Sequence, residues 1–343
     1  MRSVPLALAL AALALLPAAA HAKPVIGIAD QKSDMFTDAR FQQLGVRTVR
    51  VAIAWDAMKT KWQVDEADRY LALARAAGVN PLVTWAPSRL AGKRTKWPTA
   101  AQFVTQFKKF RVRYPWIKTF STWNEANYNG FGPWDKPELA AKWWLALRKA
   151  CTTCTILGAD VLDYPNMVSW VRRFLKQTKG LQPKYWGLHN YVSINRAQTY
   201  PITDLLRTVK GKVWITETGG LVAKRNNSKT KLPQGKAHAA NVVKMLLTKV
   251  AKMARIQRIY LYQWNSSSNV DSWDSALVGS DGKVRPAYAQ LLVRLPVPRT
   301  PLPALSEVQV AGIIAHEVPA SVPPGTAPAP LLPALAPPPL PTR

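Results

Sequence analysis

The chain alternates short runs of apolar residues with longer segments in which apolar residues recur every three or four positions. The short runs are typical of buried parallel strands, and the longer segments are typical of the amphipathic helices that cover them. Eight short runs occupy residues 25–29, 48–55, 81–85, 117–123, 155–159, 185–189, 213–216 and 258–264. Eight strand–helix repeats in about 270 residues favour a closed (β/α)8 TIM barrel over an open sheet.

The helical segments carry recognisable start signals. Residues 99–102, Thr-Ala-Ala-Gln, form a capping box, and Phe103, Phe107 and Phe110 follow it on one helical face. Residues 135–138 open another helix, with a proline in its first turn. No GxGxxG or Walker sequence follows any predicted strand, which argues against a nucleotide-binding sheet.

Composition divides the chain into three segments, 1–22, 23–295 and 296–343. The middle segment holds every predicted strand and is expected to form one barrel domain. The last segment contains Pro-Pro-Gly-Thr-Ala-Pro-Ala-Pro and Ala-Pro-Pro-Pro-Leu-Pro, which leaves few residues that favour a helix or a strand. We therefore expect it to be a disordered or polyproline-like extension.

The first segment has the three parts of a secretory signal peptide. Arg2 precedes an unbroken apolar run at 6–16, and the chain then continues to Ala-His-Ala at 20–22. This pattern predicts cleavage before Lys23 and an extracytoplasmic location, either secreted or associated with the cell wall. A membrane anchor is the alternative, but the run is short and Pro17 follows it. No other segment is apolar enough to predict a transmembrane span.

The chain is strongly basic, with 47 Lys and Arg against 19 Asp and Glu, a formal net charge of +28. Nearly all of this charge lies in 23–295, because 1–22 adds one positive charge and the charges of 296–343 cancel. Such a field attracts polyanions, which for an exported protein include wall polymers, lipid surfaces and acidic glycans. A solvated basic surface without a partner is the alternative. No nucleic-acid-binding motif is present, so nucleic acid is not an expected partner.

The two cysteines, Cys151 and Cys154, enclose two threonines. In a cytosolic protein this spacing suggests a redox motif or half of a zinc site. The chain has no second cysteine pair, and an oxidising compartment is predicted, so a local disulfide is favoured. The four histidines lack HExxH spacing. We therefore expect neither a catalytic metal nor a cofactor.

Carboxylates follow two of the predicted strands directly. The run 117–123 leads into Asn124 and Glu125, and 213–216 leads into Glu217. A carboxylate leaving a buried strand is costly unless it has a partner or a role. The active sites of TIM barrels lie at these strand ends, and glycoside hydrolysis needs two carboxyl groups beside the scissile bond. A salt bridge would explain either glutamate alone, but the pair points to this reaction.

The segments Trp-Asn-Glu-Ala-Asn at 123–127 and Ile-Thr-Glu-Thr-Gly at 215–219 resemble the catalytic segments of clan A glycoside hydrolases. The resemblance extends over residues 24–295, and the compact body is most similar to family 39-like and family 128-like β-glycanases. It implies a retaining hydrolase of a β-linked glycan that acts by double displacement, and the signal-peptide pattern predicts that this hydrolase is secreted. Glu125 would be the general acid/base and Glu217 the nucleophile. An anionic glycan remains compatible with the basic charge.

The same resemblance implies roles for further residues at strand ends. Arg50 would keep Glu217 ionised, and Tyr191 would donate a hydrogen bond to Glu217. Asn124 would bind the sugar 2-hydroxyl, and His189 would line the site, although a packing role for this histidine is equally compatible.

Aromatic side chains at strand ends are candidates for stacking on sugar rings. Trp264 resembles the floor beneath the sugar at the cleavage point in this clan. Trp85 and Trp55 also lie at the ends of predicted strands, and we expect them to contact sugar. The alternative to a hydrolase is a non-catalytic, glycan-binding or wall-associated barrel protein.

Overall fold

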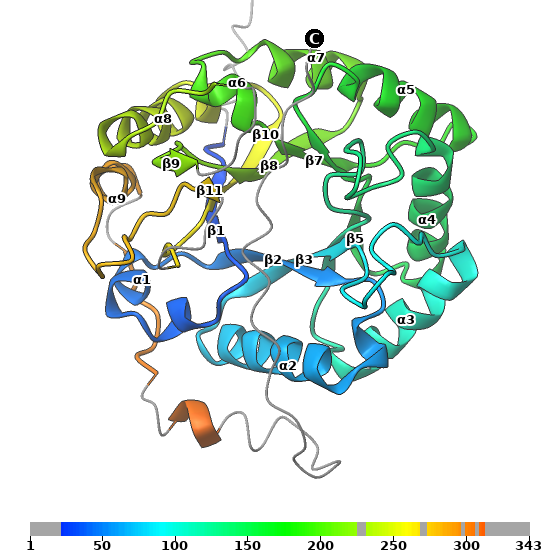
Figure 1. Ribbon diagram of the computed structural model, residues 1–343, viewed down its shortest axis with the longest axis horizontal. Helices are drawn as coiled ribbons and strands as arrows, with labels where there is room; N and C mark the ends of the chain where they lie inside the picture. Colours follow the sequence, from blue (N-terminus) through cyan, green and yellow to red (C-terminus); the bar gives the residue numbers. More distant parts are fainter. Residues whose placement is uncertain (1–21, 225–230, 268–272, 296–298, 306–308, 313–343) are drawn as a thin grey trace, which may run out of the picture.

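The computed structural model describes residues 22–224, 231–267, 273–295, 299–305 and 309–312. The predicted signal peptide, except Ala22, and most of 296–343 lie outside the described residues. Figure 1 shows a ring of helices around a central sheet. No helix of the described residues is long and apolar enough to cross a membrane.

The central sheet has the order β5-β4-β3-β2-β1-β10-β8-β7-β6, and neighbouring strands are parallel. Its strands are β1 (Val25–Ala29), β2 (Thr48–Ala54), β3 (Asn80–Ala86), β4 (Thr119–Ser121), β5 (Thr155–Leu157), β6 (Asp160–Leu162), β7 (Tyr185–His189), β8 (Lys212–Thr218) and β10 (Ile256–Tyr262). Only Gly158 and Ala159 separate β5 from β6, so these two form one interrupted barrel strand. Because β5 pairs with β4 and β6 with β7, the predicted (β/α)8 barrel is confirmed.

Helices follow the strands and cover the outside of the barrel (Figure 1). They are α1 (Ala39–Leu44), α2 (Lys61–Ala76), α3 (Ala100–Arg113), α4 (Pro137–Ala150), α5 (Met167–Gln177), α6 (Tyr191–Asn195), α7 (Tyr200–Thr208), α8 (Lys236–Thr248) and α9 (Pro286–Leu292). Short 3-10 turns span Asp34–Thr37, Ala57–Lys59 and Val250–Lys252. The predicted capping box of α3 is confirmed, because Thr99 and Gln102 exchange hydrogen bonds.

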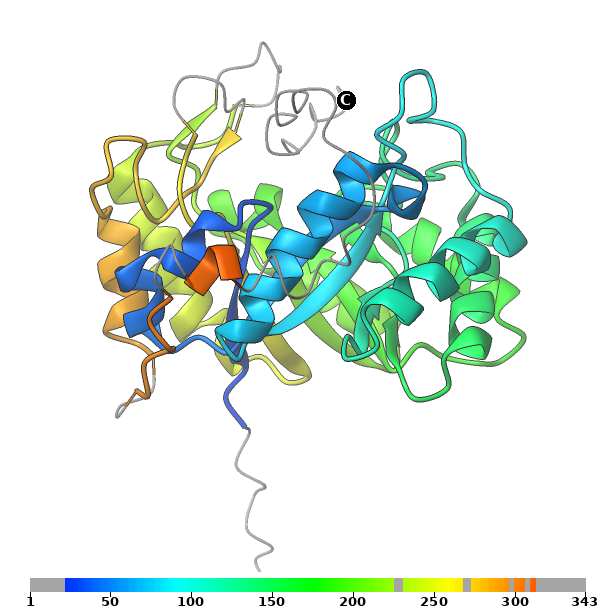
Figure 2. The same cartoon turned by 90° about the horizontal axis from the view of Figure 1, so that it is seen from below.

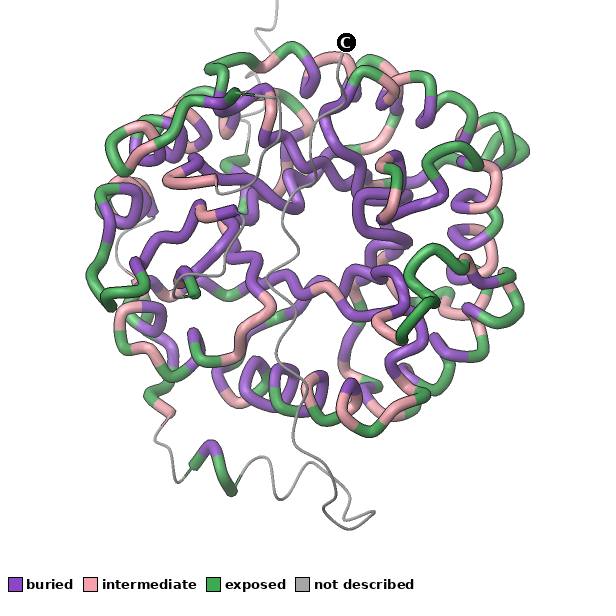
Figure 3. The backbone as a smooth tube through the Cα atoms, viewed as in Figure 1, coloured by how far each residue is buried: buried purple, intermediate pink, exposed green. Residues whose placement is uncertain are grey.

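Strand alternation separates two apolar layers. In β2, Val49, Val51 and Ile53 belong to the large core that packs against the helices. Arg50 lies between them and therefore points into the barrel. A smaller cluster, which includes Leu82 and residues of several other strands, fills the interior of the barrel. Figure 3 shows the resulting pattern, with buried residues along the strands and exposed residues on the outer turns of the helices.

The two ends of the barrel differ. Figure 2 shows the chain entering β1 at one end, while the carboxyl ends of the strands open at the other. At that second end, β9 (Ala223–Lys224) pairs antiparallel with β11 (Trp273–Asp274). The residues that follow β3, β4, β7 and β8 therefore meet at one rim.

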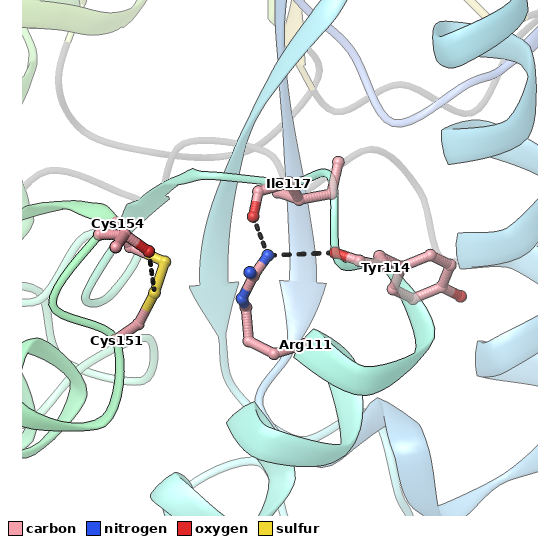
Figure 4. The surroundings of a disulfide bond; sticks show 6 residues. Arg111, Tyr114, Ile117, Cys151 and Cys154 are labelled. Atoms are coloured by element: carbon pink, nitrogen blue, oxygen red, sulfur yellow. Dashed lines mark hydrogen bonds between the residues drawn. A yellow bond between two sulfur atoms is a disulfide. The ribbon is translucent and has the colours of Figure 1, made fainter.

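Cys151 and Cys154 form a disulfide directly after α4, with Cα atoms 5.4 Å apart (Figure 4). Next to it, the Arg111 guanidinium donates to the carbonyl oxygens of Tyr114 and Ile117 at the start of β4. The disulfide thus closes a turn between α4 and β5, away from the rim that carries the strand-end glutamates.

Candidate active site

A buried arginine organises the rim. Arg50, on β2, donates to Glu217 at 2.7 Å, to Asp160 at 2.8 Å and to Asn124 at 2.5 Å. Its side chain is 2% exposed, so these contacts replace water around the guanidinium. Burial by itself would lower the Arg50 pKa, but the negative charges of Asp160 and Glu217 raise it. One fixed cation therefore joins residues from β2, β6, β8 and the segment after β4.

Glu217, on β8, has both carboxylate oxygens occupied. Arg50 donates to Oε2, and the Tyr191 hydroxyl donates to Oε1 at 2.8 Å. Burial and the neighbouring negative charge of Glu217 raise the Tyr191 pKa well above its ordinary value, so this hydroxyl keeps its proton. A cation and a neutral donor on the two oxygens hold the Glu217 carboxylate in one orientation.

Glu125 lies in a different environment. It follows β4 in a left-handed backbone conformation, with φ of 48°, which is uncommon for a residue that is not glycine. Its side chain contacts His189 at 3.2 Å, and the residue is 3% exposed. Burial raises the Glu125 pKa, the contact with His189 lowers it, and the charge of Glu217 raises it further, so that the pKa stays above its ordinary value. Burial therefore favours the protonated form of this carboxyl group.

His189 lies between the two glutamates. Its Nδ1 atom is 3.2 Å from Glu125 Oε1 and 3.8 Å from Glu217 Oε2. Since both distances share one atom, the two carboxylate oxygens are no further apart than the sum, about 7 Å; retaining enzymes need about 5–5.5 Å. Burial lowers the His189 pKa, but the charge of Glu217 and the contacts with Asp160 and Glu125 raise it to about 9.

Asp160 is a site residue that the sequence analysis did not select. It begins β6 and accepts hydrogen bonds from Arg50, from Ser121 at 2.7 Å and from Thr84 at 3.0 Å. His189 Nε2 is 3.6 Å from its Oδ2 atom. Burial would raise the Asp160 pKa, yet Arg50, His189 and Ser121 hold it well below its ordinary range. The signal was available, because Asp160 follows the apolar run 155–159 just as the two glutamates follow theirs.

The three tryptophans predicted to contact sugar lie elsewhere, and those predictions are wrong. Trp264, Trp85 and Trp55 are 0%, 1% and 7% exposed, and all three belong to the core that faces the helices. Trp264 packs against Phe41 at 5.4 Å, and Trp85 against Phe110 at 5.0 Å. For Trp85 the physical reason is strand alternation: Thr84 points inward to Asp160, so Trp85, the next residue, points outward. Trp264 lies beyond the end of β10, where the alternation of the strand no longer applies.

Other aromatic residues line the interior of the barrel near Glu217. Tyr262, at the end of β10, and Trp273, on β11, belong to the same cluster as Tyr191. Their rings lie 6.4 and 5.0 Å from the Tyr191 ring, centre to centre. These two side chains are better candidates for a sugar platform than the tryptophans selected from the sequence.

The structure thus brings six of the selected residues together at one rim: Arg50, Asn124, Glu125, His189, Tyr191 and Glu217. Within the described residues, no group of three or more His, Cys, Asp or Glu side chains is placed to hold a metal ion. A closed parallel barrel with two buried glutamates at its carboxyl rim, one held by an arginine and a tyrosine, defines a barrel glycosidase as the class of protein.

Comparison with protein families agrees with this class. The family model described as "Glycosyl hydrolase catalytic core" matches residues 91–290, more than half of the chain, and the chain belongs to this family. The match includes both glutamates. No curated protein matches the chain in sequence.

Solved structures share the fold at low sequence identity. A family 39 glycoside hydrolase from Bacteroides cellulosilyticus WH2 is 13% identical with a TM-score of 0.53, over 81% of this chain and 64% of that one. Xylanase 10B from Thermotoga maritima is 14% identical with a TM-score of 0.55, over 79% and 94%. A family 128 endo-β-1,3-glucanase from Amycolatopsis mediterranei is 15% identical with a TM-score of 0.53, over 79% and 99%.

Proposed function

We propose that this glycoside hydrolase cleaves a β-linked glycan with retention of anomeric configuration, with Glu217 as the nucleophile and Glu125 as the general acid/base. The observation that carries the proposal is that two glutamates at the same rim lie in different environments. Glu217 is held by Arg50 and Tyr191, whereas Glu125 is buried against His189 with a raised pKa. Retaining hydrolysis requires one charged and one protonated carboxyl group about 5–5.5 Å apart.

In the first step, Glu217 attacks the anomeric carbon and the glycosidic bond breaks. Glu125 gives its proton to the departing oxygen, so the leaving sugar departs as a neutral alcohol. Arg50 and Tyr191 keep Glu217 oriented until the covalent bond to the sugar forms. Asn124, whose Oδ1 atom accepts from Arg50 at 2.5 Å, would bind the sugar 2-hydroxyl.

In the second step, Glu125 acts as a base. It takes a proton from water while the water oxygen attacks the anomeric carbon, and the bond to Glu217 breaks. Loss of the Glu217 charge in the covalent intermediate removes one cause of the raised Glu125 pKa, so Glu125 is ionised when a base is needed. Two inversions give net retention.

Turnover of aryl β-glycosides and β-glucans tests the proposal, with NMR of the first-formed anomer. Glu217→Gln should lower kcat by at least about 10⁴-fold. Glu125→Gln should lower it by about 10²–10⁴-fold, and by less with an acidic phenol as leaving group, which needs little proton donation. Glu138→Gln, on α4, removes a surface carboxylate paired with Arg173 and serves as the matched control. Wild-type rates in both active-site variants, or an inverted first product, would refute the mechanism.

Azide separates the two roles. In Glu125→Ala, azide should replace water in the second step and release a glycosyl azide of retained configuration. In Glu217→Ala, azide should replace the carboxylate in the first step and release the inverted azide. The opposite pairing of variant and product would exchange the two assignments.

We also propose that the protein is exported and acts outside the cytoplasm. The pattern of residues 1–22 supports this, and so does the disulfide between Cys151 and Cys154, since disulfides persist in oxidising compartments. N-terminal sequencing of the secreted protein should find Lys23 first. Full-length protein retained in the cytoplasm would contradict it.

A further inference from the structure

A cavity of about 400 Å³ opens where β2 and β3 end against α2. Ala52 and Ala54 line it from β2, and strand alternation puts both on the same face as Arg50. Ala86 lines it from β3, on the same face as Thr84. These small side chains line part of a space in the size range of small-ligand sites, and Val51 and Ile53, which face the helices, line it as well.

The cavity lining is basic. Its cations are Lys32, Arg69, Arg89 and Arg94, against the carboxylates of Asp34 and Glu66. Both carboxylates already have partners. Glu66 forms an ion pair with Arg89, and Asp34 accepts from Asn265 at 2.8 Å. The lining itself thus has an excess of two positive charges, and Lys32 is paired with Asp30, which lies outside the lining.

Two of these guanidinium groups lack an acidic partner within the described residues. Arg69, on α2, donates to the Ser33 hydroxyl at 3.2 Å. Arg94, after β3, donates to the Gly130 carbonyl at 3.3 Å and lies 4.4 Å from the centre of the Phe131 ring. Guanidinium groups bind planar anions through paired hydrogen bonds, and these two retain donors for that purpose.

The same lining contains buried polar atoms that can bind a sugar ring. The Tyr70 hydroxyl and Gln63 Oε1 are both buried, and neither has a hydrogen-bond partner among the residues that the structure describes. Burying such atoms without a partner is costly, so a ligand that supplies hydroxyl groups would satisfy them.

We propose that this cavity is a subsite for a sugar unit that carries a negatively charged substituent, so that the substrate is an acidic β-glycan. Arg69 and Arg94 would bind the carboxylate or sulfate group, while Tyr70 and Gln63 would bind ring hydroxyls. The inference rests on the proposed hydrolase function, because the cavity gains its role as an extension of that cleft.

Binding, measured apart from turnover, tests the subsite. The full-length Glu217→Gln protein is titrated calorimetrically with β-1,3- and β-1,4-linked glucose hexasaccharides, and with the same hexasaccharides oxidised to carboxylates at C6. A third series, sulfated at C6, distinguishes the two anions. We expect an acidic series to bind about tenfold more tightly than its neutral counterpart, and Arg69→Gln with Arg94→Gln to abolish most of that preference.

The matched control removes two positive charges elsewhere, with Arg172→Gln and Lys176→Gln on the exposed side of α5. It should leave the preference intact. Equal affinity for the neutral and acidic hexasaccharides would overturn the subsite. An equal loss of the preference in the control variant would also overturn it, because the preference would then come from the overall positive charge of the protein. Hydrolysis by the wild-type protein is scored separately. If the wild type hydrolyses glycans but the binding experiment shows no preference for acidic ones, the subsite alone is rejected. If acidic glycans bind more tightly but no glycan is hydrolysed, the hydrolase function is rejected.

Discussion

Asp160→Asn should destabilise the fold more than its conservative shape suggests. The change keeps the size of the side chain but removes the charge that faces Arg50 at 2.8 Å, in a position with 0% exposure. Breaking a buried ion pair from one side typically costs about 3–5 kcal/mol. Glu217 still faces Arg50 at 2.7 Å in the variant, so we expect the lower end, about 3 kcal/mol. Urea unfolding at pH 7 measures this difference.

The destabilisation should depend on pH with a defined sign. The Asp160 pKa is lower in the folded protein than in the unfolded chain. Its charge therefore stabilises the fold above the unfolded pKa of about 4, and this contribution is lost as the pH falls through the folded pKa. The difference in the free energy of unfolding between the wild type and Asp160→Asn should be largest at neutral pH and should decrease as the pH falls below about 4.

Asp163→Asn is the matched control, because Asp163 is also a buried aspartate in the segment that ends β6. It accepts from the backbone N–H groups of Ser193 at 2.6 Å and Val192 at 3.3 Å, and burial raises its pKa. Its charge is therefore not a source of stability at neutral pH, and we expect a smaller loss, about 1 kcal/mol. A loss below about 1 kcal/mol for Asp160→Asn, or equal losses in the two variants, would refute this account of the charged centre.

Two further changes test the neighbours of Asp160. Gly187→Ala would put a Cβ atom 1.9 Å from Asp160 Oδ1, so it should lower Tm and destabilise the fold by about 1–3 kcal/mol. Gly312→Ala is the control, because Gly312 has open space around it and the change should leave Tm unaltered. An unchanged Tm for Gly187→Ala would contradict the close packing of Gly187 against Asp160. His189→Asn removes a contact that lowers the Glu125 pKa, so the alkaline limb of kcat/KM should move to higher pH, and a shift to lower pH would contradict the role of His189.

The sequence was sufficient to predict the barrel because its strands are buried on both faces. Continuous apolar runs predicted β1 and β7 at their observed bounds, and the other barrel strands within a few residues. The interruption between β5 and β6 could not be predicted, since Gly158 continues the run. In the structure a Cβ atom at Gly158 would lie 2.9 Å from Trp186, so this glycine permits a close contact between distant segments.

The sequence does not show which side of a strand each residue faces. A run that is apolar on both faces does not show which positions point inward, and the tryptophans were selected without it. Arg50 sets the alternation once its partners are known: positions 50, 52 and 54 share the inner face, and Trp55 falls on the outer one. An inward charged residue such as Arg50 is thus a better guide to cleft residues than aromatic character alone.

The roles of the two glutamates also depend on neighbours that lie far away in the sequence. Locally the two are alike, since each follows a buried strand beside a threonine or an asparagine. Glu217 receives donors from Arg50, 167 positions away, and from Tyr191, whereas Glu125 is buried against His189 on a left-handed backbone. The proposed division into acid and nucleophile therefore depends on β2, on β7 and α6, and on the barrel closure that brings them to the same rim.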